Sequence, residues 1–150
     1  MEGKLDKEQV CYRKLKRYKY QLMDAYRIQI DLNPTQDILT DYVQLSIDGQ
    51  LTLTKYYAWD GPSGPTFDTL NFMRGSLVHD GLYQLIREKH LDYDLQEFAD
   101  QLLKQMCIED GMSRFRAWYV HKAVSIFGKR SLKKSRKKEE KPIFAPWAEK

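Results

Sequence analysis

The 150-residue sequence has no long apolar run and little cysteine. Its uncharged apolar stretches, such as residues 75–79, are far shorter than the roughly 20 residues of a membrane-spanning helix. The basic, polar N-terminus lacks the apolar segment of a secretory signal peptide. Two cysteines, Cys11 and Cys107, allow at most one disulfide, whereas small secreted scaffolds depend on several. We therefore expect no membrane span, no export and a reducing compartment.

Short signatures of common enzyme classes are also missing. The chain has no P-loop, paired Cys-x-x-Cys, His-Glu-x-x-His, Gly-x-Ser-x-Gly or Rossmann glycine motif. These absences argue against the familiar types of nucleotide-binding, zinc-dependent and serine-hydrolase site. Any chemistry must come from a less standard arrangement of residues.

The composition is that of one globular domain with a charged extension. Hydrophobic residues make up 42% and aromatic residues 13% of the chain, which is too rich for intrinsic disorder. The formal net charge of +4 is uneven, because residues 129–150 hold nine Lys or Arg and three Glu, whereas residues 1–128 have a net charge of −2. We expect a single domain over residues 1–128, a helix stop at Gly128 and a basic, flexible tail over residues 129–150.

The basic tail has two interpretations. Its positive charge could bind phosphates of nucleic acid or anionic lipid. Blocks of like charge are commonly solvated and disordered, and we favour that interpretation. The tail ends in a short hydrophobic segment, residues 143–147, which is typical of a segment that docks in a groove.

Alternating apolar residues predict strands in the N-terminal half. Every second residue is apolar over residues 18–22 and 26–30. Two further apolar runs, residues 42–47 and 51–53, flank Asp48 and Gly49, a pair typical of a type I′ hairpin turn. A loop with two glycines and two prolines follows at residues 60–65.

The apolar period changes to that of helices after residue 68. We predict helices over residues 69–89, from a capping box at Asp94, and from a Ser113 cap to Gly128. Strands followed by helices indicate an α+β fold, with N-terminal antiparallel strands and a hairpin before three helices. The apolar stripe expected on the third helix is Phe115, Tyr119, Ala123, Ile126 and Phe127.

Three polar residues near the middle of the chain could carry catalysis. His79 and Asp100 lie on successive predicted helices, on the flanks of the apolar stripes, where antiparallel packing can bring them together. A carboxylate that holds one imidazole nitrogen fixes the tautomer and stabilises the cation when the ring takes a proton. Tyr83, one turn after His79, could donate a hydrogen bond into this site. His79, Asp100 and Tyr83 are the candidate catalytic residues.

Two further acids could bind a metal. Asp60 lies in the Gly- and Pro-rich loop 19 residues before His79, and Asp80 directly follows that histidine. A hard cation such as calcium prefers oxygen ligands, which these carboxylates and the loop carbonyls offer. Asp60 and Asp80 are therefore the candidate calcium ligands. All these side chains also have a structural interpretation as turn, surface or satisfied helix-flank residues.

Tyrosines near the N-terminus alternate with basic residues, a pattern that could stack on and neutralise a single-stranded nucleic acid. A half-buried strand gives the same pattern, and we favour the strand. The tyrosines are Tyr12, Tyr18, Tyr20 and Tyr26, and the basic residues are Arg13, Lys14, Lys16, Arg17, Lys19 and Arg27.

The central motifs resemble those of a family of small phage and prophage proteins of uncharacterised function. That family has a loop of the form Asp-Gly-Ala-Ser-x-Pro, then His-Asp-x-Leu-Tyr on a helix, Ala-Asp on the next helix and a closing aromatic helix that ends in Gly. Residues 60–65, 78–83, 99–100 and 119–128 follow that order, with Pro62 in place of the small loop residue. The resemblance implies a location in the cytoplasm of a host cell or in a virion.

The same residues are similar, more distantly, to the site of secreted phospholipase A2 enzymes. In those enzymes an Asp-Gly loop precedes a helix with His-Asp-x-x-Tyr, and an Asp on an antiparallel helix orients the His. The likeness implies that His79 activates water, Asp100 holds its tautomer, and Asp60 and Asp80 bind calcium, which polarises the ester carbonyl. This chain lacks the disulfides and the full glycine-rich calcium loop of those enzymes.

Two functions follow from these resemblances and remain open at this point. The first is a phage-type, phospholipase A2-like hydrolase that cleaves an ester in a lipid or cell-envelope component with calcium assistance. The second is a noncatalytic protein, either a virion component or a factor that binds a phage or host protein, in which the same residues are structural.

Overall fold

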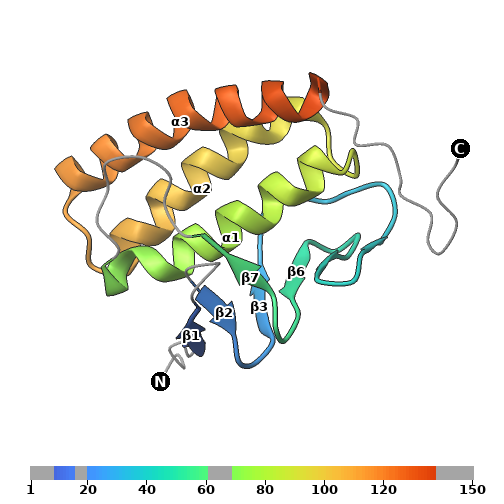
Figure 1. Ribbon diagram of the computed structural model, residues 1–150, viewed down its shortest axis with the longest axis horizontal. Coiled ribbons are helices and arrows are strands. Elements are labelled where there is room, and N and C mark those ends of the chain that lie inside the picture. The colour runs from blue at the N-terminus through green and yellow to red at the C-terminus, as the bar shows by residue number, and fades with distance from the viewer. Residues whose placement is uncertain (1–8, 16–19, 61–68, 138–150) are drawn as a thin grey trace, which may run out of the picture.

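The structure is a computed structural model that describes residues 9–15, 20–60 and 69–137. Antiparallel strands come first and three helices follow, so the predicted α+β fold is confirmed (Figure 1). Of the predicted loop over residues 60–65, only Asp60 lies within the described residues. The predicted hydrophobic segment at residues 143–147 also lies outside them.

Short strands form two antiparallel sheets. One sheet has the strand order β1-β2-β7, and the other has the order β3-β6-β5-β4. The alternating pattern buries every second residue, as in β5 and β6, where buried leucine and valine residues alternate with more exposed polar residues. The strands are β1 Tyr12–Lys14, β2 Tyr20–Leu22, β3 Tyr26–Gln29, β4 Ile38–Leu39, β5 Val43–Leu45, β6 Gln50–Leu53 and β7 Ala58–Trp59.

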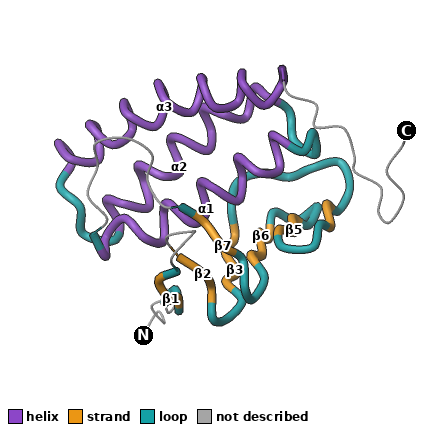
Figure 2. The backbone as a smooth tube through the Cα atoms, in the orientation of Figure 1, coloured by secondary structure: helices purple, strands orange, loops and turns teal. Residues whose placement is uncertain are grey.

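The three helices are successive antiparallel neighbours. They are α1 Leu70–Arg87, α2 Gln96–Glu109 and α3 Arg114–Lys137, with a short 3-10 helix η1 at Tyr93–Leu95 before α2. Figure 2 shows α2 beside both α1 and α3, and the strands on the side of α1 that faces away from α3. Within the described ranges, no helix is long and apolar enough to cross a membrane.

Two groups of buried residues form the core, and α1 contributes to both. Because α1 packs against the sheets and against the other helices, residues on most of its circumference are buried. The first group includes Leu22, Leu53, Leu77 and Leu82. The second includes Phe72, Leu103, Cys107 and Val120.

Both cysteines are free thiols. Cys107 is buried and Cys11 is exposed, so the one disulfide that the sequence allows is not formed. Burial raises the pKa of the Cys107 thiol to about 12, which keeps it protonated and unreactive at neutral pH.

The predicted hairpin is confirmed, but its turn type is wrong. A type I′ turn needs positive φ at both central residues, and within this turn only Gly49 has one, at 86°. The Gly49 amide donates to the Ser46 carbonyl at 2.9 Å, and the Ser46 amide donates to the Gln50 carbonyl at 3.0 Å. The loop therefore has three residues, with glycine in the left-handed position that closes a bulge.

Of the two N-terminal helix caps predicted for α2 and α3, one is wrong and the other is confirmed. The Asp94 cap is wrong, because Asp94 belongs to η1 and its amide donates to the Asp92 side chain instead. The Ser113 cap is confirmed: its Oγ accepts from the Arg116 amide at 3.2 Å.

Gly128 does not end the third helix. The helix continues to Lys137, and Leu132 is almost fully buried, so residues 129–137 of the predicted tail belong to α3. A Cβ atom at Gly128 would lie only 2.3 Å from the Tyr83 hydroxyl oxygen. The glycine thus permits a close approach between α3 and α1 rather than a helix stop.

The predicted apolar stripe of α3 is also wrong. Of its five members only Ala123 is buried, whereas Phe115, Tyr119, Ile126 and Phe127 are exposed. The buried face instead holds small or branched residues, which let the helices approach closely. These residues are Ala117, Val120, Ala123 and Val124.

The N-terminal tyrosines support the strand interpretation over nucleic-acid binding. Tyr20 and Tyr26 are buried, and Tyr12 packs edge-on against Tyr20 and Trp59 at ring-centroid distances of 5.4 and 6.0 Å. Tyr20 and Tyr26 are part of the core and cannot stack on bases, and Tyr12 is partly buried against them. Tyr18 lies outside the described residues.

We predict that Gly128→Ala lowers the free energy of unfolding by about 1–3 kcal/mol, because the new methyl group clashes with the Tyr83 hydroxyl. Urea denaturation measures this change. The methyl group would also lie 2.8 and 2.9 Å from two carbons of the Tyr83 ring, so the partner variant in a double-mutant cycle is Tyr83→Ala, which removes the whole ring and should reduce the cost of Gly128→Ala. Additive effects of the two substitutions would contradict the assigned role of this glycine.

Candidate functional site

A buried His–Asp pair joins the first two helices. His79 on α1 and Asp100 on α2 are 7% and 2% exposed, and their Nε2 and Oδ1 atoms are 2.7 Å apart. The two residues are 21 positions apart in sequence, and the antiparallel packing of α1 and α2 brings them together. The predicted proximity is thus confirmed, and the packing of α1 against α2 buries both side chains.

Two hydroxyl groups complete the surroundings of the Asp100 carboxylate. Tyr83, one turn after His79 on α1, donates to Asp100 Oδ1 at 2.6 Å. Ser125 of α3 donates to Asp100 Oδ2 at 3.2 Å. The carboxylate therefore receives hydrogen bonds from two other helices, which offsets the cost of burying it.

The Asp100 contact determines how the His79 ring is used. An ionised carboxylate only accepts hydrogen bonds, so Nε2 carries a proton and Nδ1 of the neutral ring is left as the basic nitrogen. Nδ1 faces Asp80 Oδ1 at 3.7 Å, which is longer than a hydrogen bond and leaves this nitrogen able to take a proton from another group. The Tyr83 ring lies against the imidazole at a centroid distance of 4.1 Å and limits its rotation.

The protonation equilibria of the neighbouring groups are coupled to this geometry. Burial by itself lowers the pKa of His79, but the hydrogen bond to Asp100 and the nearby Asp80 carboxylate outweigh it and raise the pKa above the usual value. Burial raises the pKa of Asp80, and the charge of Asp60 acts in the same direction, against the effects of His79 and Arg87.

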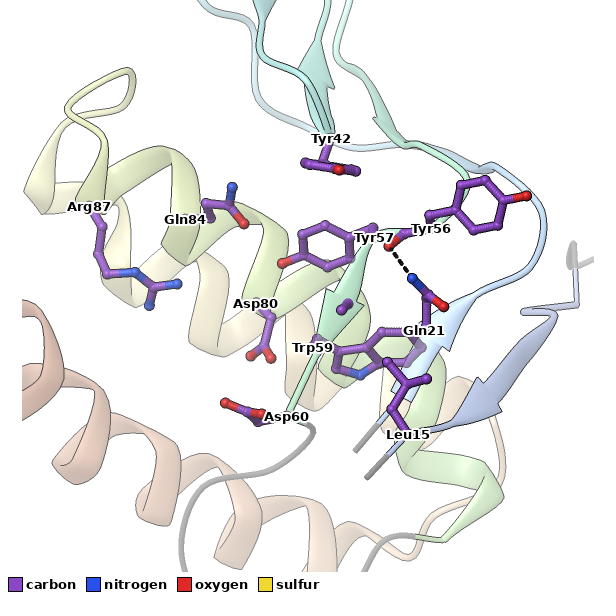
Figure 3. A pocket seen from close by; sticks show the side chains of 11 residues that line it. Leu15, Gln21, Tyr42, Tyr56, Tyr57, Trp59, Asp60, Asp80, Gln84 and Arg87 are labelled. Atoms are coloured by element: carbon purple, nitrogen blue, oxygen red, sulfur yellow. Dashed lines mark hydrogen bonds between the residues drawn. The ribbon is translucent and has the colours of Figure 1, made fainter. Parts of the chain in front are cut away.

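Asp80 and Asp60 line an open pocket of about 560 Å³ between α1 and the strands. Figure 3 shows the two carboxylates turned toward each other at one end, with Gln84 and Arg87 farther along α1. Aromatic side chains cover the opposite wall. They are Tyr42, Tyr56, Tyr57 and Trp59.

The pocket wall is held to α1 by a buried contact. The indole nitrogen of Trp59 donates to Ser76 Oγ at 3.2 Å, and this bond positions β7 immediately before Asp60. Burial and the charge of Asp80 raise the pKa of Tyr57, so this phenol stays protonated and can donate a hydrogen bond.

Asp60 and Asp80 fit a hard cation in part. Calcium takes six to eight oxygen ligands, and these carboxylates supply two ligand groups of the preferred kind. Among the residues that the structure describes, no group of three or more His, Cys, Asp or Glu side chains is placed to hold a metal. From the described lining of this pocket, further oxygen ligands would have to come from the Gln21 or Gln84 amides, tyrosine hydroxyls, backbone carbonyls or water.

A second pocket, of about 520 Å³, lies on the other side of Asp100 between α2 and α3. Ser125 and His121 contribute to its wall, and burial lowers the pKa of His121. Buried Nε2 atoms of His121 and Gln96 have no hydrogen-bond partner among the described residues. This pocket borders the carboxylate and not the basic nitrogen of His79.

All five site residues predicted from the sequence lie in this region, but they form two groups. His79, Tyr83 and Asp100 are the buried group, and Asp60 and Asp80 line the pocket. Sequence reasoning missed Ser125, which lies beside the buried face of α3. It also missed Gln84 and Arg87, although these follow Asp80 at helical spacings of four and seven residues.

Comparisons with known proteins found no similar protein. No protein-family model, curated protein or solved structure matches this chain. The functional interpretation therefore depends on the geometry and on the motifs of the chain itself.

The raised pKa of His79 predicts a pH-dependent contribution to stability in calcium-free buffer. Because the folded-state pKa lies above the unfolded value of about 6.5, this contribution is complete below that pH and is lost as the pH rises through the folded value. Unfolding free energies of wild type and His79→Gln, measured across pH, should therefore converge at high pH. His90→Gln is the matched control at an exposed site, and a difference that grows with pH would refute the expectation.

Proposed function

We propose that the protein is an ester hydrolase in which His79 is the general base. The single observation that supports this function most is the contact between His79 Nε2 and Asp100, which leaves Nδ1 as the basic nitrogen beside the Asp80 carboxylate. A structural histidine needs only one satisfied contact, whereas this ring is fixed on one side and directed at a pocket residue on the other.

His79 performs the proton transfers in this mechanism. A water molecule hydrogen-bonded to Nδ1 attacks the ester carbonyl carbon while Nδ1 takes its proton. The resulting imidazolium is stabilised by Asp100 and Asp80. When the tetrahedral intermediate collapses, the C–O bond to the leaving group breaks and Nδ1 returns the proton to the departing alkoxide, which gives an acid and an alcohol.

Asp100 and Tyr83 are positioning residues. Asp100 holds the tautomer and raises the basicity of the ring, and Tyr83 fixes the carboxylate through its 2.6 Å hydrogen bond. Ser125 supports the other carboxylate oxygen from α3. None of these three needs to touch the substrate.

Asp60 and Asp80 would hold calcium at the pocket end of the site. When bound, calcium supplies Lewis-acid polarisation of the ester carbonyl and stabilises the oxyanion. The two carboxylates face each other in the pocket, so their mutual repulsion favours a cation between them (Figure 3).

We propose that the protein is of phage type and that its substrate is an ester of a lipid or cell-envelope component. The exposed rings of Tyr42 and Tyr56 in the pocket wall offer apolar contact to an acyl chain. The Arg87 guanidinium offers a cation at the far end of the same pocket. The resemblance of the motif order to that of phospholipase A2 enzymes supports the same substrate class, and the resemblance to the phage family supports the phage-type origin.

Hydrolysis of a fluorogenic phospholipid ester, with calcium present, tests the proposal. His79→Gln should lower kcat/KM by at least about a hundredfold, because the general base is lost. Wild-type activity should rise with pH through the raised pKa of His79, since the base must be unprotonated. Asp100→Asn should shift this profile to lower pH, a change that a merely structural role would not produce.

The control for the histidine variant is His90→Gln, which should retain wild-type activity and stability. Activity of His79→Gln equal to that of wild type would refute the hydrolase. Loss of stability in His79→Gln without any wild-type ester hydrolysis would favour the noncatalytic alternative, a virion component or host-binding factor.

Calcium should raise the melting temperature of the wild-type protein by binding preferentially to the folded state. Asp60→Asn and Asp80→Asn should each weaken this stabilisation by removing a charged ligand. Differential scanning fluorimetry with and without calcium measures the effect, with magnesium as the competing cation. Asp31→Asn, an exposed carboxylate outside the pocket, is the control. An equal calcium response in all four proteins would exclude this site.

A further inference from the structure

The outer surface of α3 carries apolar side chains that no described part of the chain covers. Phe115 and Ile126 are 78% and 55% exposed, and the Phe115 ring lies 6.2 Å from that of Trp118. We call this surface the outer face of α3. Its apolar members are Phe115, Trp118, Tyr119 and Ile126.

The outer face is a second apolar side of the same helix. At 100° per residue, its apolar residues and the exposed Lys122 and Lys129 fall within an arc of about 100°, roughly opposite the buried Ala117, Val120 and Val124. A helix that is apolar on opposite sides is typical of one covered on both. The described residues of the domain cover only one side.

Charge decides which occupant suits the outer face. The helix contains nine Lys or Arg residues and no Asp or Glu. Among the described side chains, Arg114, Lys122, Lys129 and Arg130 are exposed on it. Exposed aromatic residues among basic residues, with no acidic residue on the helix, match the interface of an anionic bilayer. There Trp and Tyr lie at the depth of the headgroups, and Lys and Arg contact the phosphates.

We infer that the outer face of α3 binds the surface of an anionic phospholipid membrane. A second copy of the chain would bring together two helices that have no carboxylate to neutralise their positive charge. Protein–nucleic acid interfaces are more polar than a face built around Phe115 and Ile126. The inference does not depend on the hydrolase, because no described residue of the outer face contacts His79, Tyr83 or Asp100; the α3 side chain that does is Ser125.

Co-sedimentation with vesicles tests this inference on the full chain. The protein should bind phosphatidylglycerol vesicles at least about tenfold more tightly than phosphatidylcholine vesicles, and added salt should weaken the binding. Trp118 fluorescence should shift to shorter wavelength on binding. The Trp118→Phe variant identifies this signal, because the chain also has Trp59 and Trp147. Equal binding to the two vesicle types, or none, would overturn the inference.

Two pairs of variants separate apolar insertion from charge. Phe115→Ser with Ile126→Ser should weaken vesicle binding at least about tenfold, whereas Leu39→Ser with Ile47→Ser, at exposed sites on the strand side, should not. Lys122→Glu with Lys129→Glu should weaken vesicle binding at least about tenfold. Lys14→Glu with Arg27→Glu is the matched control, because it makes the same change in net charge on strands β1 and β3.

Other occupants give distinct results. Concentration-dependent dimers in sedimentation velocity that Phe115→Ser with Ile126→Ser abolishes would assign the face to a second copy. Tighter binding to a single-stranded oligonucleotide than to phosphatidylglycerol vesicles would assign it to nucleic acid. Either result would overturn the membrane assignment. His79→Gln should bind vesicles like wild type, which distinguishes failure of the surface from failure of the hydrolase.

Discussion

The buried Asp100 carboxylate is the constraint on which the helical half of the structure depends. A charge in this position is tolerated only because His79, Tyr83 and Ser125 donate hydrogen bonds to it from two other helices. These bonds fix the mutual positions of all three helices. The close approach of Gly128 to Tyr83 follows from the same requirement, because the tyrosine must reach Asp100 beneath α3.

The buried His79–Asp100 pair lies next to a solvent-open pocket, because Asp80 directly follows His79 on the helix. Successive helical residues point about 100° apart, so His79 can be buried against Asp100 while Asp80 lines the open pocket. The imidazole thus has one nitrogen in a fixed, desolvated contact and the other beside a pocket residue. This division, with the raised pKa that results from the two acids, is what distinguishes the site from an ordinary buried histidine.

The third helix has apolar residues on two sides, and its sequence pattern alone does not show which side is buried. Its large aromatic residues are the natural choice for a core, yet small residues form the buried side, because close packing of α3 on its neighbours leaves little room. The large residues remain on the outside together with the basic ones. The pattern is therefore that of a helix with two apolar sides, of which the described residues cover one.

Local pattern alone determined the α+β order, the hairpin, the extent of α1, the Ser113 cap and the spacing that makes a contact between His79 and Asp100 possible. These features depend on neighbouring residues, whose periods and caps are visible in the sequence. Tertiary packing decided the rest: the direction in which α3 faces, the reason for Gly128, the Ser125 contact and the burial of the His–Asp pair. Each depends on which residues from distant segments meet, and one chain's pattern of apolar residues does not specify which of two apolar faces a helix buries.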